Sequence, residues 1–285
     1  MIMLFLPLNF LSPTMDLSQV KMVVTDMDGT LLNSKSEVSD QFFELFDTLK
    51  TLNIQFVAAS GRQYSSIQDK LMSIAEEITI VAENGGYIKQ AGTELGSIHL
   101  SEQHVNKLIP LLRAVDDIHI VLCGKRSAYI EKNDARFIHV LKEYYTKFEV
   151  VEDLLTEVKD DCFKVAIYHF ESSETFIYPH VKHLESELQV KVSGSNWVDI
   201  ADQKSNKGEA IKLLQRKFGI SKEETMVFGD YNNDLEMIDQ AYFSYAMENA
   251  HENVKLAARF QTGNNNSAGV ETILKRLIES KKTKT

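Results

Sequence analysis

Cysteine is scarce in this sequence. The 285 residues contain only Cys123 and Cys162, which lie far apart and do not have the spacing of metal ligands. A disulfide-stapled fold and a cysteine zinc site are therefore not expected, and we predict two reduced thiols in a cytoplasmic protein. The eight histidines show no metal-ligand spacing either.

Basic residues are also in short supply. The chain has 31 Lys and Arg against 41 Asp and Glu, which gives a net charge of -10. This balance argues against a nucleic-acid-binding surface and against a basic face for membranes. The same excess of acid suits a protein that holds cations in an acidic site.

The sequence has no stretch that resembles a membrane span, which needs ~20 apolar residues. Residues 1–11 are apolar but too short, and they lack the basic region and cleavage site of a signal peptide. We treat residues 1–14 as an appendage of unknown role, with Met15 as an alternative start. The whole chain is 44% apolar and 25% charged, as expected for a soluble globular protein of one large or two ordinary domains.

Strands and helices alternate at the start of the chain. Apolar runs predict strands near 21–26, 54–59 and 78–82, and helical periodicity predicts helices over 39–50 and 63–75. This alternation indicates an α/β protein with a parallel, doubly wound sheet. Residues 15–86 and 194–285 are expected to form this core, to which the chain returns at Trp197-Val-Asp-Ile200.

Residues 87–193 have a different character and are expected to form an inserted α+β domain. The predicted helices of the insert are 101–114, 134–146 and 174–187, and its predicted strands are 118–123, 127–131, 163–169 and 189–193. No linker rich in proline, glycine and serine marks its edges. After the insert, the expected core elements are a helix at 208–218, strands at 225–228 and 243–246, and helices near 249–258 and 269–280.

The stretch 21–32 organises the rest of the chain. It begins as the apolar run of a buried strand and ends in polar turn residues, which are Asp26, Asp28, Gly29 and Thr30. An ordinary strand that ends in an Asx-type turn would look similar, so this stretch alone does not decide its function.

Other strand ends carry a matching set of polar residues. These are Ser60, then Lys207 at a helix start, and finally Asp230, Asn233 and Asp234. Because the carboxyl ends of parallel strands share one edge of a sheet, we expect these side chains to converge. Clustered carboxylates raise one another's pKa, and a hard divalent cation such as Mg²⁺ relieves the repulsion.

The same set can perform phosphoryl transfer. A carboxylate can attack phosphorus to give an aspartyl-phosphate, and a second acid can protonate the leaving oxygen. A lysine, a serine hydroxyl and backbone N–H groups can bind the phosphate. Phosphoryl transfer depends mainly on positioning and charge neutralisation, which these residue types supply.

At this point the chain resembles the haloacid dehalogenase superfamily, and in particular its Cof-type phosphatases, over about residues 20–280. Four motifs match in order: Asp26-Met-Asp28-Gly-Thr30-Leu-Leu, Ala-Ser60-Gly61-Arg62, Ser-Asn-Lys207-Gly208 and Gly229-Asp230-Tyr-Asn-Asn233-Asp234. The resemblance implies a Rossmann-like core with a cap domain inserted after the third strand.

The resemblance also implies roles for the matched residues. Asp26 would be the nucleophile and Asp28 the general acid/base, while Ser60 and Lys207 would bind the phosphoryl group. The residues expected at the Mg²⁺ site are Asp26, Asp28 (through its backbone carbonyl), Asp230 and Asp234. The residues expected beside phosphate or substrate are Gly29, Thr30, Ser60, Gly61, Arg62, Asn84, Lys207, Asn233 and Asn265, the last in a register that Asn264 and Asn266 leave open.

Simpler interpretations remain for several of these residues. Ser60 and Asp234 would also suit helix caps, and Lys204 is a rival for the role of Lys207. Arg62 and Asn84 are as well explained by structural roles as by substrate contacts. Trp197 is interpreted as a core residue, and Lys125-Arg126 as an exposed turn.

The sequence therefore predicts a Mg²⁺-dependent phosphatase that acts on a small phosphorylated metabolite, such as a sugar or cofactor phosphate. A phosphomutase or phosphotransferase would use the same aspartyl-phosphate, so it remains an alternative. A non-catalytic phospho-ligand sensor is disfavoured, because a sensor has no need of a general acid at Asp28. The sequence names neither the substrate nor the oligomeric state.

Overall fold

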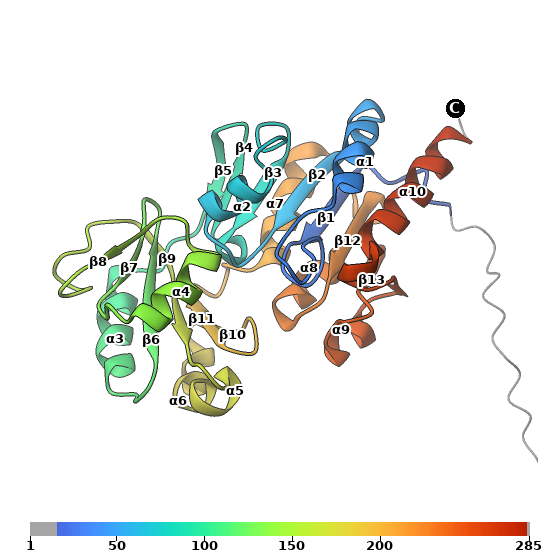
Figure 1. The fold of residues 1–285 in the computed structure, drawn as a ribbon. Helices are drawn as coiled ribbons and strands as arrows, with labels where there is room; N and C mark the ends of the chain where they lie inside the picture. Colours follow the sequence, from blue (N-terminus) through green and yellow to red (C-terminus); the bar gives the residue numbers. More distant parts are fainter. Residues whose placement is uncertain (1–15, 284–285) are drawn as a thin grey trace, which may run out of the picture.

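The computed structural model describes residues 16–283, and the predicted appendage 1–14 lies outside the described residues. Two sheets, each with its own helices, lie side by side (Figure 1). No helix within 16–283 has the length and apolar character needed to cross a membrane. Cys123 and Cys162 are both buried and are not joined to each other.

The first sheet has eight strands in the order β14-β13-β12-β1-β2-β3-β4-β5. All neighbours from β14 to β3 are parallel, and the last two pairings are antiparallel. The strands are β1 (Met22–Asp26), β2 (Gln55–Ala59), β3 (Thr79–Ala82), β4 (Tyr87–Gln90), β5 (Thr93–Ser97), β12 (Thr225–Gly229), β13 (Phe243–Ala246) and β14 (Phe260–Gln261). The predicted α/β fold with a parallel, doubly wound sheet is confirmed.

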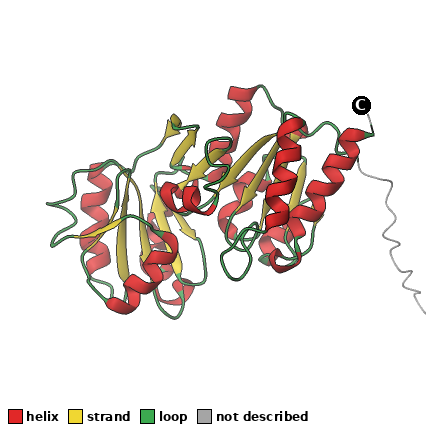
Figure 2. Ribbon diagram, turned by 45° about the horizontal axis from the view of Figure 1, so that its top comes forward, coloured by secondary structure: helices red, strands yellow, loops and turns green. Residues whose placement is uncertain are grey.

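Helices cover both faces of this sheet (Figure 2). They are α1 (Asp40–Thr51), α2 (Tyr64–Lys70), α7 (Lys207–Phe218), α8 (Leu235–Ile238), α9 (Glu252–Ala257) and α10 (Gly269–Lys282). Ser39 caps α1 by accepting a hydrogen bond from the Phe42 N–H, and Phe42, Phe46 and Leu49 of α1 are buried at helical spacing. Helix α1 packs against α10, and α7 packs against α8.

The second sheet has six mostly antiparallel strands in the order β10-β11-β9-β6-β7-β8. They are β6 (His119–Gly124), β7 (Ala128–Ile130), β8 (Phe148–Val150), β9 (Cys162–Tyr168), β10 (Gln189–Val192) and β11 (Trp197–Ala201). The helices beside it are α3 (Glu102–Arg113), α4 (Ala135–Tyr144), α5 (Ser173–Phe176) and α6 (Tyr178–Val181). The helix predicted over 174–187 is broken into short pieces, since Pro179 cannot continue the preceding turn.

Both faces of the second sheet are apolar. Val165 and Ile167 of β9 pack into one cluster, whereas Ala166 and Tyr168 pack into another on the opposite face. Successive side chains of a strand point to opposite faces, so a strand covered by helices on both sides is buried along its whole length. This is why β9 is apolar in the sequence at every position except Lys164.

The edges of the two sheets do not coincide with the predicted boundaries at 86/87 and 193/194. Residues 87–97 were expected in the insert, but they form the strands β4 and β5, which extend the first sheet as an antiparallel hairpin. Strand β11, expected in the core, pairs between β9 and β10 in the second sheet. Strand β5 is half-exposed and β11 is buried, and neither pattern tells which sheet a strand joins. The division into core and insert itself stays a prediction.

Candidate active site

Strand β1 places its last residue at the centre of the parallel sheet. In the register with β2, Asp26 lies opposite Ala59, so Ser60 follows at the same edge. In the register with β12, Thr25 lies opposite Phe228, so Asp230 emerges beside Asp26. The predicted convergence at the carboxyl ends of the strands is therefore seen in the structure.

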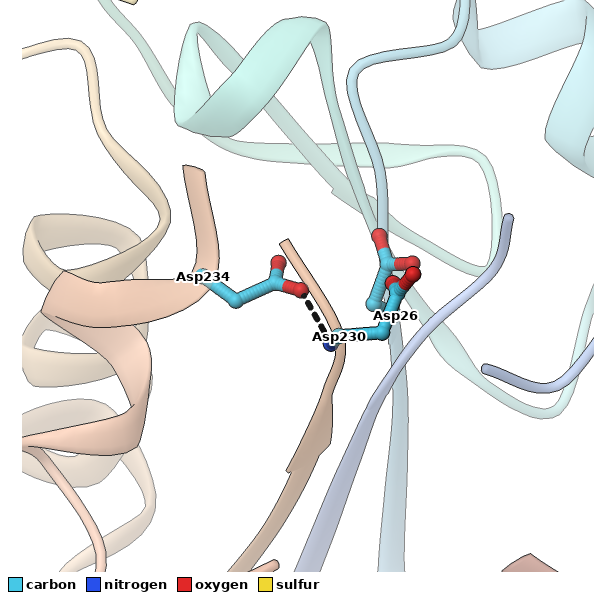
Figure 3. Close-up of side chains that lie close together, drawn as sticks. All are labelled: Asp26, Asp230 and Asp234. Atoms are coloured by element: carbon cyan, nitrogen blue, oxygen red, sulfur yellow. Dashed lines mark hydrogen bonds between the residues drawn. The ribbon is translucent and has the colours of Figure 1, made fainter. Parts of the chain in front are cut away.

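Three carboxylates meet at this edge. Asp26, Asp230 and Asp234 each offer one oxygen, and these oxygens lie within 4.8 Å of one another (Figure 3). Burial and the neighbouring Asp234 raise the pKa of Asp26 well above its ordinary value. The same two causes raise the pKa of Asp230 to about 7.

Lys207 supplies the positive charge that faces these carboxylates. It is fully buried at the start of α7, where Asn206 caps the helix. Its Nζ lies 2.5 Å from Asp26 Oδ1 and 2.6 Å from Asp234 Oδ1. Burial alone would lower the pKa of Lys207, but the two carboxylates outweigh that effect and raise it. Its rival Lys204 is exposed.

Asp234 braces the loop that carries Asp230. Its Oδ2 accepts hydrogen bonds from the backbone N–H groups of Asp230, at 2.9 Å, and of Tyr231, at 3.1 Å. Figure 3 shows the first of these contacts, with the carboxylates of Asp26 and Asp230 close together. Both oxygens of Asp234 are therefore already hydrogen-bonded, one to Lys207 and one to the loop.

The donor set fits a hard divalent cation. When all three carboxylates are ionised, they and the one ammonium group leave two negative charges in a buried space, and oxygen is the ligand that Mg²⁺ prefers. Within residues 16–283, this trio is the one group of three such side chains close enough to share an ion.

This charge imbalance predicts that the metal-free protein loses stability as pH rises from about 4 to about 7. Because the folded-state pKa of Asp230, about 7, exceeds its ordinary value of 3.8, the folded protein holds more protons than the unfolded chain in this window. The contribution of Asp230 is therefore full below pH 4 and lost as pH passes 7. Melting temperatures in EDTA should show this fall in the wild type and a shallower one in Asp230→Asn; equal slopes would contradict the assignment.

Gly29 lets the loop after β1 approach Asp230. Its φ is +75°, and a Cβ on it would lie 2.2 Å from Asp230 Oδ2. Thr30, the next residue, donates a hydrogen bond of 3.1 Å from its Oγ1 to Asp230 Oδ1. The two residues together set the position of the Asp230 carboxylate.

We expect Gly29→Ala to lower kcat/KM by about 100-fold, because the new methyl group would displace the Asp230 carboxylate. Gly92→Ala is the matched control, since Gly92 has nearly the same φ, +73°, and no atom within 4 Å of its Cβ position. Both variants carry the backbone cost of a left-handed residue, about 1–2 kcal/mol. Only Gly29→Ala should lose activity in a phosphate-release assay, and similar losses in both would refute the steric argument.

Arg62 forms a two-point ion pair with Asp28, the second aspartate of the β1 turn. Its Nε and Nη2 donate to the two oxygens of Asp28 at 2.7 and 2.6 Å. The same guanidinium group donates to the backbone carbonyl of Glu143 in α4 and lies over the ring of Tyr144, 4.8 Å from its centroid. Arg62, predicted beside the substrate, thus connects Asp28 to a helix of the second sheet.

Hydrogen bonds fix the polar residues of the loop after β2 and of the turn after β3. Ser60 is buried, and its Oγ accepts a hydrogen bond of 3.1 Å from the Arg62 N–H. Asn84 has a φ of +53° and donates to Asp199 Oδ2 at 2.5 Å. Its Oδ1 accepts from Asn233 Nδ2 at 3.0 Å. In this structure Asn84 and Asn233 therefore hold each other.

Asn249, rather than Asn265, lies beside the β1 turn. Asn265 donates to the Leu32 carbonyl at 2.8 Å, and its backbone N–H donates to Asn249 Oδ1 at 3.1 Å. Asn249 in turn donates to the Gly29 carbonyl at 2.8 Å. Asn249 follows the carboxyl end of β13, so the rule that identified the other strand ends applies to it as well.

A cleft of about 410 Å³ lies between the two sheets. From the predicted set it exposes Asp26, Asp28, Gly29, Ser60, Gly61, Arg62, Asp230 and Asn233. It is also lined by residues that the sequence did not single out, which are Tyr144, Tyr145, Lys164, Ser193, Gly194, Ser195, Asn196, Asp199, Tyr231 and Asn249. Trp197, expected in the core, packs against Tyr168 and Tyr144 and also lines the cleft.

Comparisons with known proteins show which family the chain resembles. A family model described as haloacid dehalogenase-like hydrolase matches residues 23–274. The chain is 32% identical over 263 residues to a 5-amino-6-(5-phospho-D-ribitylamino)uracil phosphatase of Escherichia coli K12, a match that covers 91% of this chain and 97% of the relative.

Solved structures show the same fold. A protein from Streptococcus mutans UA159 superposes with a TM-score of 0.85 at 28% identity, with 91% of this chain and 99% of the other covered. A sugar phosphatase described as HAD subclass IIB superposes with a TM-score of 0.79 at 18% identity, with 90% and 98% covered. The chain therefore belongs to the haloacid dehalogenase-like hydrolase family, and it is an enzyme of the phosphatase type within that family.

Proposed function

We propose that the protein hydrolyses small phosphomonoesters in two steps, through an aspartyl-phosphate on Asp26. The observation that carries this proposal is the end of β1. There a buried carboxylate, held by Lys207 at 2.5 Å, is followed two residues later by a second carboxylate that faces the cleft. A carboxylate becomes an effective nucleophile when it is fixed in place and a neighbouring cation keeps it ionised despite burial.

The two aspartates have different roles: Asp26 forms the bond to phosphorus, and Asp28 transfers the protons. An oxygen of Asp26 attacks phosphorus, the bond from phosphorus to the leaving oxygen breaks, and Asp28, protonated and released from Arg62, gives that oxygen a proton. Asp28 then takes a proton from a water molecule that attacks phosphorus, and the bond from phosphorus to Asp26 breaks to release phosphate. Ser60, the backbone N–H groups near it and Lys207 bind the phosphoryl oxygens.

The charge imbalance at the three carboxylates supports a bound Mg²⁺. Asp26, Asp230 and the backbone carbonyl of Asp28 would hold the ion, and Asp234 would keep the Asp230 loop in place. When bound, Mg²⁺ would neutralise the carboxylates and the phosphoryl oxygens together.

The cleft favours a leaving group that has both a planar and a hydroxyl-rich part. Tyr144 and Trp197 offer aromatic surface, and Ser195 and Asn196 offer hydrogen-bonding groups. The Escherichia coli relative is named for a uracil that carries a phosphorylated ribityl chain. We propose that compound as the first substrate to test, ahead of simple sugar phosphates.

Phosphate release from a panel of phosphorylated compounds tests the function. The panel contains the ribitylaminouracil phosphate, sugar phosphates, nucleotides and cofactor phosphates, each with Mg²⁺ and with EDTA. Release that requires Mg²⁺ and is fastest for the ribityl compound is the expected result. Phosphate that moves to another position or another acceptor, without release, would instead indicate a mutase or phosphotransferase on the same aspartate.

A further inference from the structure

A second lysine is buried near the cleft, and it comes from the second sheet. Lys164 of β9 is only 2% exposed. Its Nζ donates to the Gly61 carbonyl at 2.7 Å and lies 3.2 Å from both Glu83 Oε2 and Asp199 Oδ2. An ammonium group removed from water needs such partners, so its position is tightly determined.

With the contact from Lys164 to Gly61, all three backbone carbonyls of residues 60–62 accept a hydrogen bond. The Ser60 carbonyl accepts from the Asn84 N–H at 3.0 Å, and the Arg62 carbonyl accepts from the Glu83 N–H at 3.1 Å. Lys164 binds the carbonyl between them. With all three carbonyls held, the peptide planes of residues 60–62 are fixed in orientation, and this fixes the backbone position from which the Ser60 side chain projects.

Asp199 connects Lys164, through Asn84, to the loop after β12. It pairs with Lys164 and accepts a hydrogen bond from Asn84. Asn84 is held in a left-handed conformation and bonds to Asn233, the residue before Asp234. One pair of side chains from the second sheet is thereby connected to the loops on both sides of Asp26.

We propose that Lys164 is a positioning residue for the reaction. Together with Asp199, it fixes the conformation of the 60–62 loop and the contact between Asn84 and Asn233. This inference rests on the proposed function. Lys164 does not touch the reacting atoms; its loss would misplace the phosphate donors and Asp234. Turnover should fall while affinity for the leaving group changes little, because the aromatic wall of the cleft is unchanged.

The test uses Lys164→Met and Asp199→Asn in the full chain. We expect kcat to fall by about 100-fold in Lys164→Met with KM within about threefold, and Lys164→Arg to retain more activity because it keeps the charge. Asp199→Asn decides the question if Lys164→Met does not fold. Arg113→Met is the control, because Arg113 also pairs with two carboxylates, Glu131 and Asp153, but at an exposed site.

Amide hydrogen exchange gives a readout that does not depend on catalysis. Exchange at Arg62 and Asn84 should be about tenfold faster in Lys164→Met or Asp199→Asn than in the wild type or Arg113→Met. Folded variants with wild-type kcat and wild-type exchange would overturn the proposal. If the wild type released no phosphate from any compound, the proposed function would fail, and the exchange rates would still decide whether Lys164 positions these loops.

Discussion

Asp26→Asn is expected to reduce phosphate release by at least about 10⁴-fold, because an amide cannot form the aspartyl-phosphate. The loss should not be accompanied by a loss of stability. The pKa of Asp26 is raised by burial and by Asp234, so its ionised form is unfavourable in the metal-free protein. Removing that charge leaves Lys207 paired with Asp234 at 2.6 Å.

Both expectations can be measured on the same preparation. Phosphate release with saturating Mg²⁺ reports the activity, and the melting temperature in EDTA reports the stability. Asp116→Asn, at an exposed aspartate, is the control for the substitution type. An Asp26→Asn protein that keeps more than about a tenth of the activity would exclude Asp26 as the nucleophile. A lower melting temperature in EDTA would contradict the electrostatic account of the site.

Lys207→Met should lose both activity and stability. The substitution leaves Asp26 and Asp234 buried without their cation, and breaking such a pair from one side costs about 3–5 kcal/mol. It also removes the ammonium group proposed to bind the phosphoryl oxygens, for which we expect about 10³-fold lower kcat. Chemical denaturation in EDTA measures the first effect, and phosphate release with Mg²⁺ measures the second.

Lys204→Met is the matched control for this prediction. Lys204 lies three residues earlier on the same segment, and it is exposed. Its substitution should change stability by less than about 0.5 kcal/mol and leave kcat unchanged. If Lys204→Met were the variant that lost activity, the assignment of the phosphate-binding lysine would be reversed.

The local chemistry of the site could be predicted from the sequence, because it depends on strand ends. Asp26, Ser60 and Asp230 each follow a short apolar run, and parallel strands must bring such ends to one edge. The five strands β1, β2, β3, β12 and β13 were predicted from such apolar runs, whereas β4, β5 and β14 were not. This part of the fold is local in sequence, so single segments carry the information.

The contacts between the two sheets could not be predicted from the strand ends. Lys164 and Asp199 lie in strands that are otherwise apolar, and the sequence of such a strand does not indicate which residues its charged side chain will contact. Their contacts to Gly61 and Asn84 span 103 and 115 positions, so no pattern within a segment reveals them. The ion pair of Arg62 with Asp28 joins two segments 34 positions apart, so neither segment alone reveals it.

The central claim is the covalent step on Asp26, and trapping the intermediate tests it most directly. The wild-type protein is mixed with substrate and Mg²⁺, quenched in acid within the first turnovers and reduced with borohydride, which converts an acyl phosphate to an alcohol. Peptide mass spectrometry should find reduction to homoserine at position 26, dependent on substrate and absent in EDTA. Phosphate release with an unmodified Asp26, or with reduction at Asp28 instead, would contradict the account.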